Sequence, residues 1–141
     1  MTKIDCGPAG TSFVVSNDST AYARTTGLYL SSNAGPLSAH LLEASVSMGA
    51  TGLCICMEGV AFAMPPMTPR HYNYVPPALR SIPVALIVNA EQATFLAGIA
   101  RVAASAGTLR RTFLSRDEAD AWVREQSRAL SANRVWWSPR R

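Results

Sequence analysis

The side chains best suited to nucleophilic or metal chemistry are two cysteines, Cys54 and Cys56, and two histidines, His40 and His71. A catalytic thiol needs a base within hydrogen-bonding reach, and a structural zinc site usually joins two Cys or His pairs at short, regular spacing. Here the cysteines form a single C-x-C pair, and the histidines lie far from it in sequence. We interpret these two cysteines and Cys6 as buried core thiols, with a pair of Cys54 and His40 or His71 as the alternative. No metal, cofactor or enzymatic activity is expected.

A proline-rich loop, residues 64–80, is the first candidate binding surface. Its methionines suit an adaptable apolar pocket, and its arginine, histidine and tyrosines suit an anionic or aromatic ligand. One hypothesis is a pocket beneath this loop for a small apolar or anionic molecule. The other is a loop that covers one end of the sheet and contacts a partner. The candidate residues are Met64, Met67, Arg70, His71, Tyr72 and Tyr74.

The basic C-terminal segment, residues 133–141, is the second candidate surface. Eight of the 13 basic residues follow residue 109, and Trp136 and Trp137 stand next to each other near the end of the chain. Two adjacent indoles in water would form an exposed apolar patch. We expect them to pack on the domain itself or on a second copy in a homodimer. Nucleic-acid and membrane binding are not expected, because the body of the chain has no dense basic stripe and no apolar run of membrane length.

The periodicity of apolar residues predicts alternating strands and helices. Residues 11–17 and 21–32 predict a hairpin in which Tyr22 and Arg24 share one face, with a bulge or bend at Gly27. The elements expected after it are a helix over 37–48, a central strand over 50–63, a strand over 82–89, a helix over 91–107, a strand over 109–114 and a helix capped by Ser115. Helices that link strands in this order predict parallel, right-handed crossovers. The expected fold is a single mixed, mostly parallel five-stranded α/β sheet with helices packed on it.

Four consecutive motifs near the C-terminus carry a family resemblance: "VALIVN", "TFLAGIARVAASAG", "RRTF" and "SRDEADAW". Together they resemble the STAS-like family, which includes the anti-sigma-factor antagonists and the SpoIIAA-like proteins. The resemblance covers about the last 60 residues on pattern. It implies a STAS-like domain over residues 1–132, followed by the tail at 133–141. It also implies a protein that works by contact with another protein, sometimes switched by phosphorylation.

The phosphorylation site of the antagonists follows the third strand, in an Asp-Ser motif at the start of a helix. The corresponding segment here, "MEGVAFAMPPMTPRHY", has no Asp-Ser pair, and Thr68 is the only hydroxyl in a comparable place. The resemblance therefore gives Thr68 as the candidate phosphoacceptor, because a phosphate at a helix N-terminus is favoured by free N–H groups. The alternative is that Thr68 caps a short helix.

These observations predict a non-enzymatic STAS-like module that acts in protein interaction or regulation, with a protein partner or itself as a homodimer. The alternative function is a carrier or sensor of a small ligand beneath the 64–80 loop. Because the first residues lack the charged and apolar regions of a signal peptide, the expected location is the cytoplasm.

Overall fold

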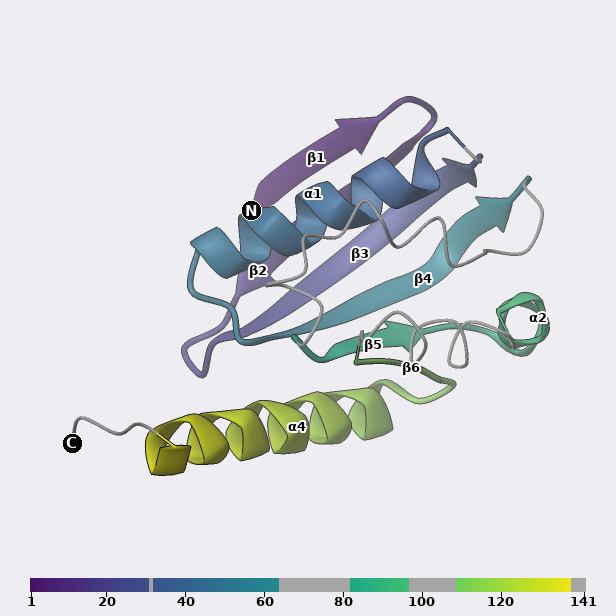
Figure 1. Cartoon of the computed structure of the whole chain (residues 1–141). Coiled ribbons are helices and arrows are strands. Elements are labelled where there is room, and N and C mark those ends of the chain that lie inside the picture. The colour runs from purple at the N-terminus through teal and green to yellow at the C-terminus, as the bar shows by residue number, and fades with distance from the viewer. Residues whose placement is uncertain (31, 64–81, 97–108, 138–141) are drawn as a thin grey trace.

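The computed structural model of the chain describes residues 1–30, 32–63, 82–96 and 109–137, with the backbone alone for Phe95 and for 131–137. Its sheet has six strands in the order β1-β2-β3-β4-β5-β6 (Figure 1). The strands are β1 (Thr2–Cys6), β2 (Ala9–Val15), β3 (Thr20–Tyr29), β4 (Gly52–Phe62), β5 (Val84–Ile87) and β6 (Arg110–Phe113). The helices in these residues are α1 (Ala34–Ser47), α2 (Ala90–Phe95) and α4 (Arg116–Trp137).

The first three strands form an antiparallel meander, and β3, β4, β5 and β6 are paired in parallel. The predicted mixed α/β sheet is therefore confirmed, with one strand more than the five expected. The strand that the sequence did not predict is β1, which alternates half-buried with exposed residues and carries charges at Lys3 and Asp5. Edge strands are often short and carry charged side chains, so the apolar pattern that predicts a strand is weak in them.

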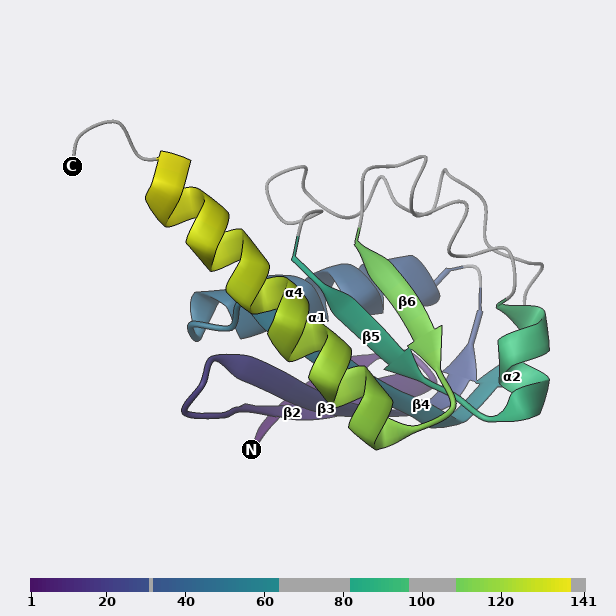
Figure 2. The same ribbon diagram turned by 90° about the horizontal axis from the view of Figure 1, so that it is seen from below.

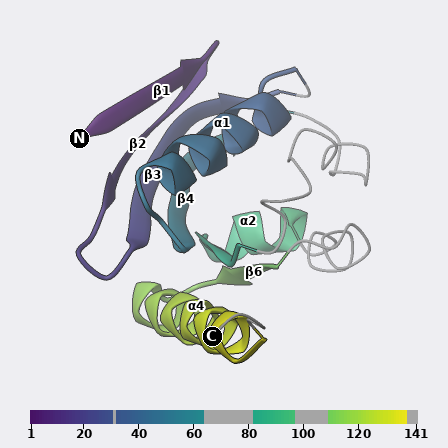
Figure 3. The ribbon, with the colours of Figure 1, turned by 60° about the vertical axis from the view of Figure 1, so that its left-hand side comes forward.

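Helices α1 and α4 lie on opposite faces of the sheet (Figure 3). The larger core lies on the α1 face and is centred on Phe13, Leu37, Leu41 and Leu53, each no more than 2% exposed. A smaller core lies on the α4 face and consists of Cys54, Ala85, Ile87, Phe113, Ala119 and Val123. Strand β4 contributes to both cores, as expected for a central strand that is covered on both faces.

Asn33, at the start of α1, joins the two ends of the antiparallel meander to that helix. Its buried side-chain amide donates to the carbonyl oxygens of Cys6 (3.1 Å) and Leu28 (3.0 Å), and its Oδ1 accepts the N–H of Leu30 (2.7 Å). A buried amide is stabilising only when its donors and acceptor are paired. Asn33 therefore fixes the β1–β2 turn against the end of β3.

The predicted helices agree with the structure in type and differ in extent. Helix α1 confirms the prediction over 37–48, and the turn after it places Gly49 at a φ of 96°. Helix α2 confirms the start of the predicted 91–107 helix, whose later part lies outside the described residues. Ser115 accepts the N–H of Glu118 at 3.4 Å at the start of α4. The fully buried side chains of α4 are Ala119 and Val123, while Trp122 is half-buried against Phe113.

The predicted irregularity at Gly27 is confirmed, although the register shift between β3 and β4 lies just before it, between Arg24 and Thr26. Gly27 itself has a φ of 106°. A Cβ at this position would lie 2.2 Å from the carbonyl oxygen of Pro8, in the turn between β1 and β2. Gly27 therefore permits both a left-handed backbone and a close approach of that turn.

We predict that Gly27→Ala lowers the free energy of unfolding by about 2 kcal/mol or more, because strain at positive φ and a backbone clash add together. Gly49→Ala is the matched control, since Gly49 also has positive φ but a Cβ added there would meet no other atom within 4 Å. That control should cost about 1 kcal/mol. Urea unfolding of both variants measures the difference, and equal losses would show that the approach of Pro8 is unimportant.

Candidate functional site on the open sheet face

Helix α4 packs against β4, β5 and β6, and no described helix covers β1, β2 and β3 on that side of the sheet (Figure 2). Residues of β1 to β3 that alternate with the core residues point to this side. We call the uncovered region the open sheet face and define it by Ser12, Val14, Tyr22, Arg24, Cys56 and Glu58. Val14 is 43% exposed there, and Met1 beside it is 85% exposed.

A shallow hollow of about 400 Å³ lies on the open sheet face beside the first turn of α4. Arg24 and Arg116 bring positive charge to it, and Glu58 brings negative charge. The thiol of Cys56 lies 3.7 Å from Oε1 of Glu58. Cys54 and Cys56 both point to this side of the sheet, and all three cysteines of the chain are free thiols. The hollow therefore combines apolar, charged and thiol groups in an accessible place.

A network of side chains links α4 to the strands along the border of this face. The Tyr22 hydroxyl donates to Oδ1 of Asp120, and Arg124 donates through Nε to the other oxygen of Asp120 at 3.0 Å. Arg124 also donates to the Tyr22 oxygen at 2.9 Å and forms an ion pair with Asp18 in the β2–β3 turn. On the same helix, Ser127 hydrogen-bonds Thr51 at 2.6 Å. Helix α4 is therefore held in place by polar contacts as well as by its apolar face.

The environment raises the pKa values of two groups at this border. Burial raises the pKa of the Tyr22 phenol well above its usual value, and the hydrogen bond to Asp120 and the charge of that carboxylate add to the effect. Burial raises the pKa of the Cys54 thiol to about 12, with a smaller contribution from the charge of Asp120. Both groups are therefore neutral at physiological pH, and Cys54 is poorly suited to act as a nucleophile.

Cys54 is buried, as predicted, whereas Cys6 and Cys56 are only partly buried. His40 lies on the exposed side of α1, and no contact in the described structure joins it to Cys54. In the described residues no three His, Cys, Asp or Glu side chains are grouped so that they could hold a metal ion. The expected absence of a cofactor stays a prediction.

The residues proposed from sequence for the 64–80 loop lie outside the described residues. They are Met64, Met67, Thr68, Arg70, His71, Tyr72 and Tyr74. Trp136 and Trp137 belong to the last turn of α4, whose backbone continues to Trp137. The predicted division into a domain over 1–132 and a tail over 133–141 stays a prediction. In the structure, the backbone of residues 133–137 continues helix α4. None of the described helices is long and apolar enough to span a membrane.

The open sheet face was not proposed from sequence, although one observation pointed toward it. Tyr22 and Arg24 alternate with small residues along β3, which placed them on one face of a hairpin. That pattern alone does not tell whether a helix covers the face. The hydrogen bond between Tyr22 and Asp120 could not be predicted, because Asp120 lies 98 positions away in sequence and reaches Tyr22 only through the packing of α4.

No protein-family model and no curated protein matches this chain. Among solved structures, the crystal structure of an anti-sigma factor antagonist from Mycobacterium paratuberculosis is similar, with a TM-score of 0.50 and 14% sequence identity. The match covers 81% of this chain and 94% of that chain. Likeness at this level of identity shows the fold. The chain therefore has a STAS-like fold, and the resemblance predicted from its C-terminal motifs is confirmed at the level of the fold.

We predict that stability falls more steeply above about pH 10 in the wild type than in Tyr22→Phe. A phenol whose pKa is raised by folding contributes stability below its unfolded pKa of 10.0, and this stability is lost as the pH rises toward its folded pKa. Asp120→Asn should give an intermediate slope, because it removes the charge and leaves the burial. Urea unfolding between about pH 9 and 11.5 provides the slopes. Parallel curves for wild type and Tyr22→Phe would contradict the role given to this hydroxyl.

The thiols should differ in reactivity. At pH 8 a thiol with a pKa of about 12 is thiolate in only about one molecule in ten thousand. We therefore expect iodoacetamide to modify the partly exposed Cys56 at least about 100-fold faster than Cys54. Mass spectrometry of proteolytic peptides over time measures both rates, and the urea-unfolded chain, in which the two rates should converge, is the control. Equal rates in the folded protein would refute the burial of Cys54.

Proposed function

We propose that this chain is a regulatory module that acts by binding another protein and not by catalysis. The observation that carries the proposal is the open sheet face, where exposed apolar and charged side chains lie together and no described element covers them. Val14, Arg24 and Glu58 supply apolar, positive and negative groups within one hollow. Exposed patches of this mixed kind commonly serve as protein-binding surfaces.

The likeness to an anti-sigma factor antagonist supports the same class of function. The solved structure has the same fold over most of its length, and that protein is named as an antagonist of an anti-sigma factor. We propose a protein partner for this chain on that basis, together with a cytoplasmic location. The 64–80 loop, with Thr68 as candidate phosphoacceptor, and the two C-terminal tryptophans are further contact surfaces in this proposal. Self-association as a homodimer is also part of it.

The partner-binding role can be tested with a photo-crosslinking amino acid in living cells. Placed at Arg24, on the open sheet face, it should give a discrete covalent adduct with a second protein. Placed at Arg128, an exposed arginine of α4, it should not. Val14→Asp, combined with the crosslinker at Arg24, should abolish the adduct while circular dichroism remains unchanged, because a charge disrupts an apolar contact.

Three outcomes would count against the proposal: no adduct from a folded chain, the same adducts from both positions, or adducts with a second copy of this chain only. The carrier or sensor hypothesis placed its ligand beneath the 64–80 loop. Native mass spectrometry of freshly purified protein tests it separately, since a carried ligand adds a fixed mass to the folded chain.

A further inference from the structure

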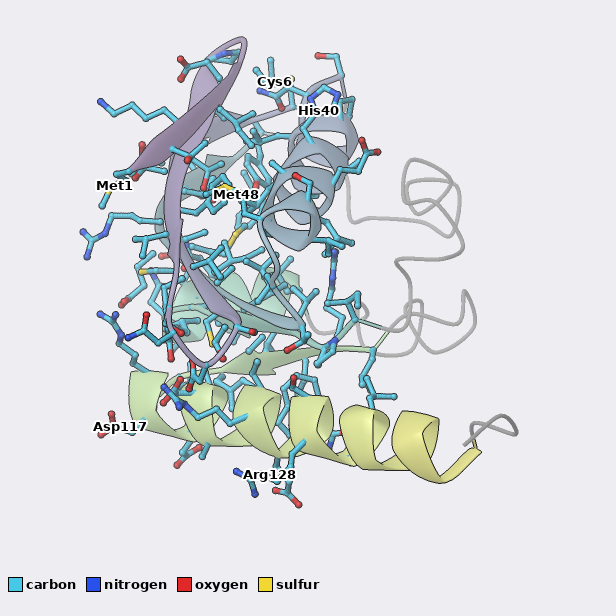
Figure 4. All side chains as sticks on the ribbon, turned by 90° about the vertical axis from the view of Figure 1, so that its left-hand side faces the viewer. Met1, Cys6, His40, Met48, Asp117 and Arg128 are labelled. Atoms are coloured by element: carbon cyan, nitrogen blue, oxygen red, sulfur yellow. The ribbon has the colours of Figure 1, made fainter. Side chains whose placement is uncertain are left out.

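Strand β1 forms one edge of the sheet and is paired with β2 alone. In Figure 1 it lies at the edge farthest from α4, and Figure 4 shows Met1 and Cys6 at its two ends. No described element pairs with its outer side. An unpaired strand edge offers a row of backbone N–H and C=O groups to which another strand can add.

The hairpin geometry tells which residues present these groups. Cys6 and Ala9 face each other across a two-residue turn in which Gly7 has a φ of 64°. The residues that flank such a turn form a hydrogen-bonded pair. Because hydrogen-bonded pairs alternate along an antiparallel ladder, Ile4 and Thr2 also bond toward β2. The backbone groups of Lys3 and Asp5 therefore point outward, and the side chains of both residues are exposed.

We propose that a second copy of this chain adds to this edge, with the two β1 strands antiparallel about a two-fold axis at Ile4. In this register Lys3 lies opposite the partner's Asp5, and Asp5 lies opposite the partner's Lys3. Each of these two positions is a hydrogen-bonded pair, which gives about four new backbone hydrogen bonds. Opposite charges that face each other across strands also attract. The sequence "TKIDC" is thus complementary to itself.

Other registers are unfavourable for two separate reasons. A shift by one residue brings outward-pointing backbone groups opposite inward-pointing ones and moves the charged side chains to the other face. A shift by two residues places Lys3 on the partner's Lys3, or Asp5 on the partner's Asp5, and like charges directly opposite are destabilising. Charges on an edge strand usually discourage pairing. Here their alternating signs leave one register in which they favour it.

The α1 side of the edge also fits a second copy. Ile4 is only partly buried against the core and meets the partner's Ile4 at the axis. Met48 is 52% exposed, and its sulfur lies 3.8 Å from the hydroxyl of Thr2. A partner strand beside Thr2 extends the surface next to Met48. A two-fold interface of this kind is self-complementary by symmetry and closes at two subunits.

This inference rests on the homodimer named in the proposed function and assigns it a surface. The edge residues Lys3 and Asp5 are distinct from Val14 and Arg24, which test partner binding. A wild type that stays monomeric but still gives the adduct at Arg24 would therefore overturn this inference and leave partner binding untouched.

Charge reversal tests the register. We expect the wild type to dimerise in sedimentation velocity at protein concentrations up to about 0.5 mM, a range chosen because small interfaces bind weakly. Lys3→Asp and Asp5→Lys should each weaken dimerisation by about tenfold or more, since each places like charges opposite each other. An equimolar mixture of the two variants should dimerise again, because every facing pair is then opposite in charge. Arg128→Asp, on exposed α4, should leave the dimer unchanged.

A monomeric wild type at these concentrations would overturn the inference. So would single variants that dimerise as well as the wild type, or a mixture that stays monomeric while the wild type dimerises. Each result is read with circular dichroism, so that a variant that fails to fold is replaced by the exposed-site substitutions Lys3→Gln and Asp5→Asn. These neutral variants should show a smaller loss of dimer in the same direction, and an unchanged dimer would again overturn the inference.

A disulfide trap tests the same register independently of charge. Thr2 should face the partner's Cys6 in a non-hydrogen-bonded pair, with Cα atoms about 4.5 Å apart, which suits a disulfide. Under mild oxidation, Thr2→Cys in a Cys56→Ser background should form a covalent dimer on non-reducing gels. Adding Cys6→Ser to this same variant gives the matched control, which should remain monomeric. Equal crosslinking of the two variants, or none in either, would place the strands in a different arrangement.

Discussion

The first part of strand β4, from Gly52 to Ile55, is buried on both faces, and most of the architecture follows from that burial. Leu53, Ile55 and Met57 point into the larger core, while Cys54 points into the smaller core beneath α4. A strand that is apolar on both sides is stable only when another element shields each face from water. Helix α4 approaches so closely that a Cβ at Gly52 would lie 2.5 Å from Cγ1 of Val123. The central strand and this helix therefore form one packed unit.

The open sheet face is a consequence of how this cover is distributed. Helix α1 packs on β1 and β2 from one side, and α4 packs on β4, β5 and β6 from the other. One helix is too narrow to cover six strands, since strands lie about 4.8 Å apart and a helix is about 10 Å wide. The network of Tyr22, Asp120 and Arg124 fixes the border at which the cover by α4 ends. The surface that remains is held by a rigid sheet, which suits a binding role.

The two proposed interaction surfaces use different physical means. The open sheet face offers side chains of mixed chemistry, so its selectivity would come from complementary charge and apolar contact. The outer edge of β1 offers backbone groups, which any strand could bond, and gains selectivity from the alternating charges of Lys3 and Asp5. Because the two surfaces involve separate residues, a dimer formed through β1 leaves Arg24 and Val14 accessible to a different protein.

The sequence by itself determined the order and type of most elements, because apolar periodicity, capping residues and turn residues act over short distances in the chain. It indicated the β2–β3 hairpin, helix α1, the central strand β4 and the cap at Ser115, and its C-terminal motifs indicated the STAS-like fold. Only the tertiary structure decided where α4 packs and which face stays open, and it added β1 as an edge strand. It also joined Tyr22 to Asp120 and Arg124. The packing of α4 and its network with Tyr22 depend on contacts between residues about a hundred positions apart, which no local pattern encodes. Strand β1 pairs locally with β2, but its charged, half-exposed sequence lacks the apolar pattern that would reveal a strand.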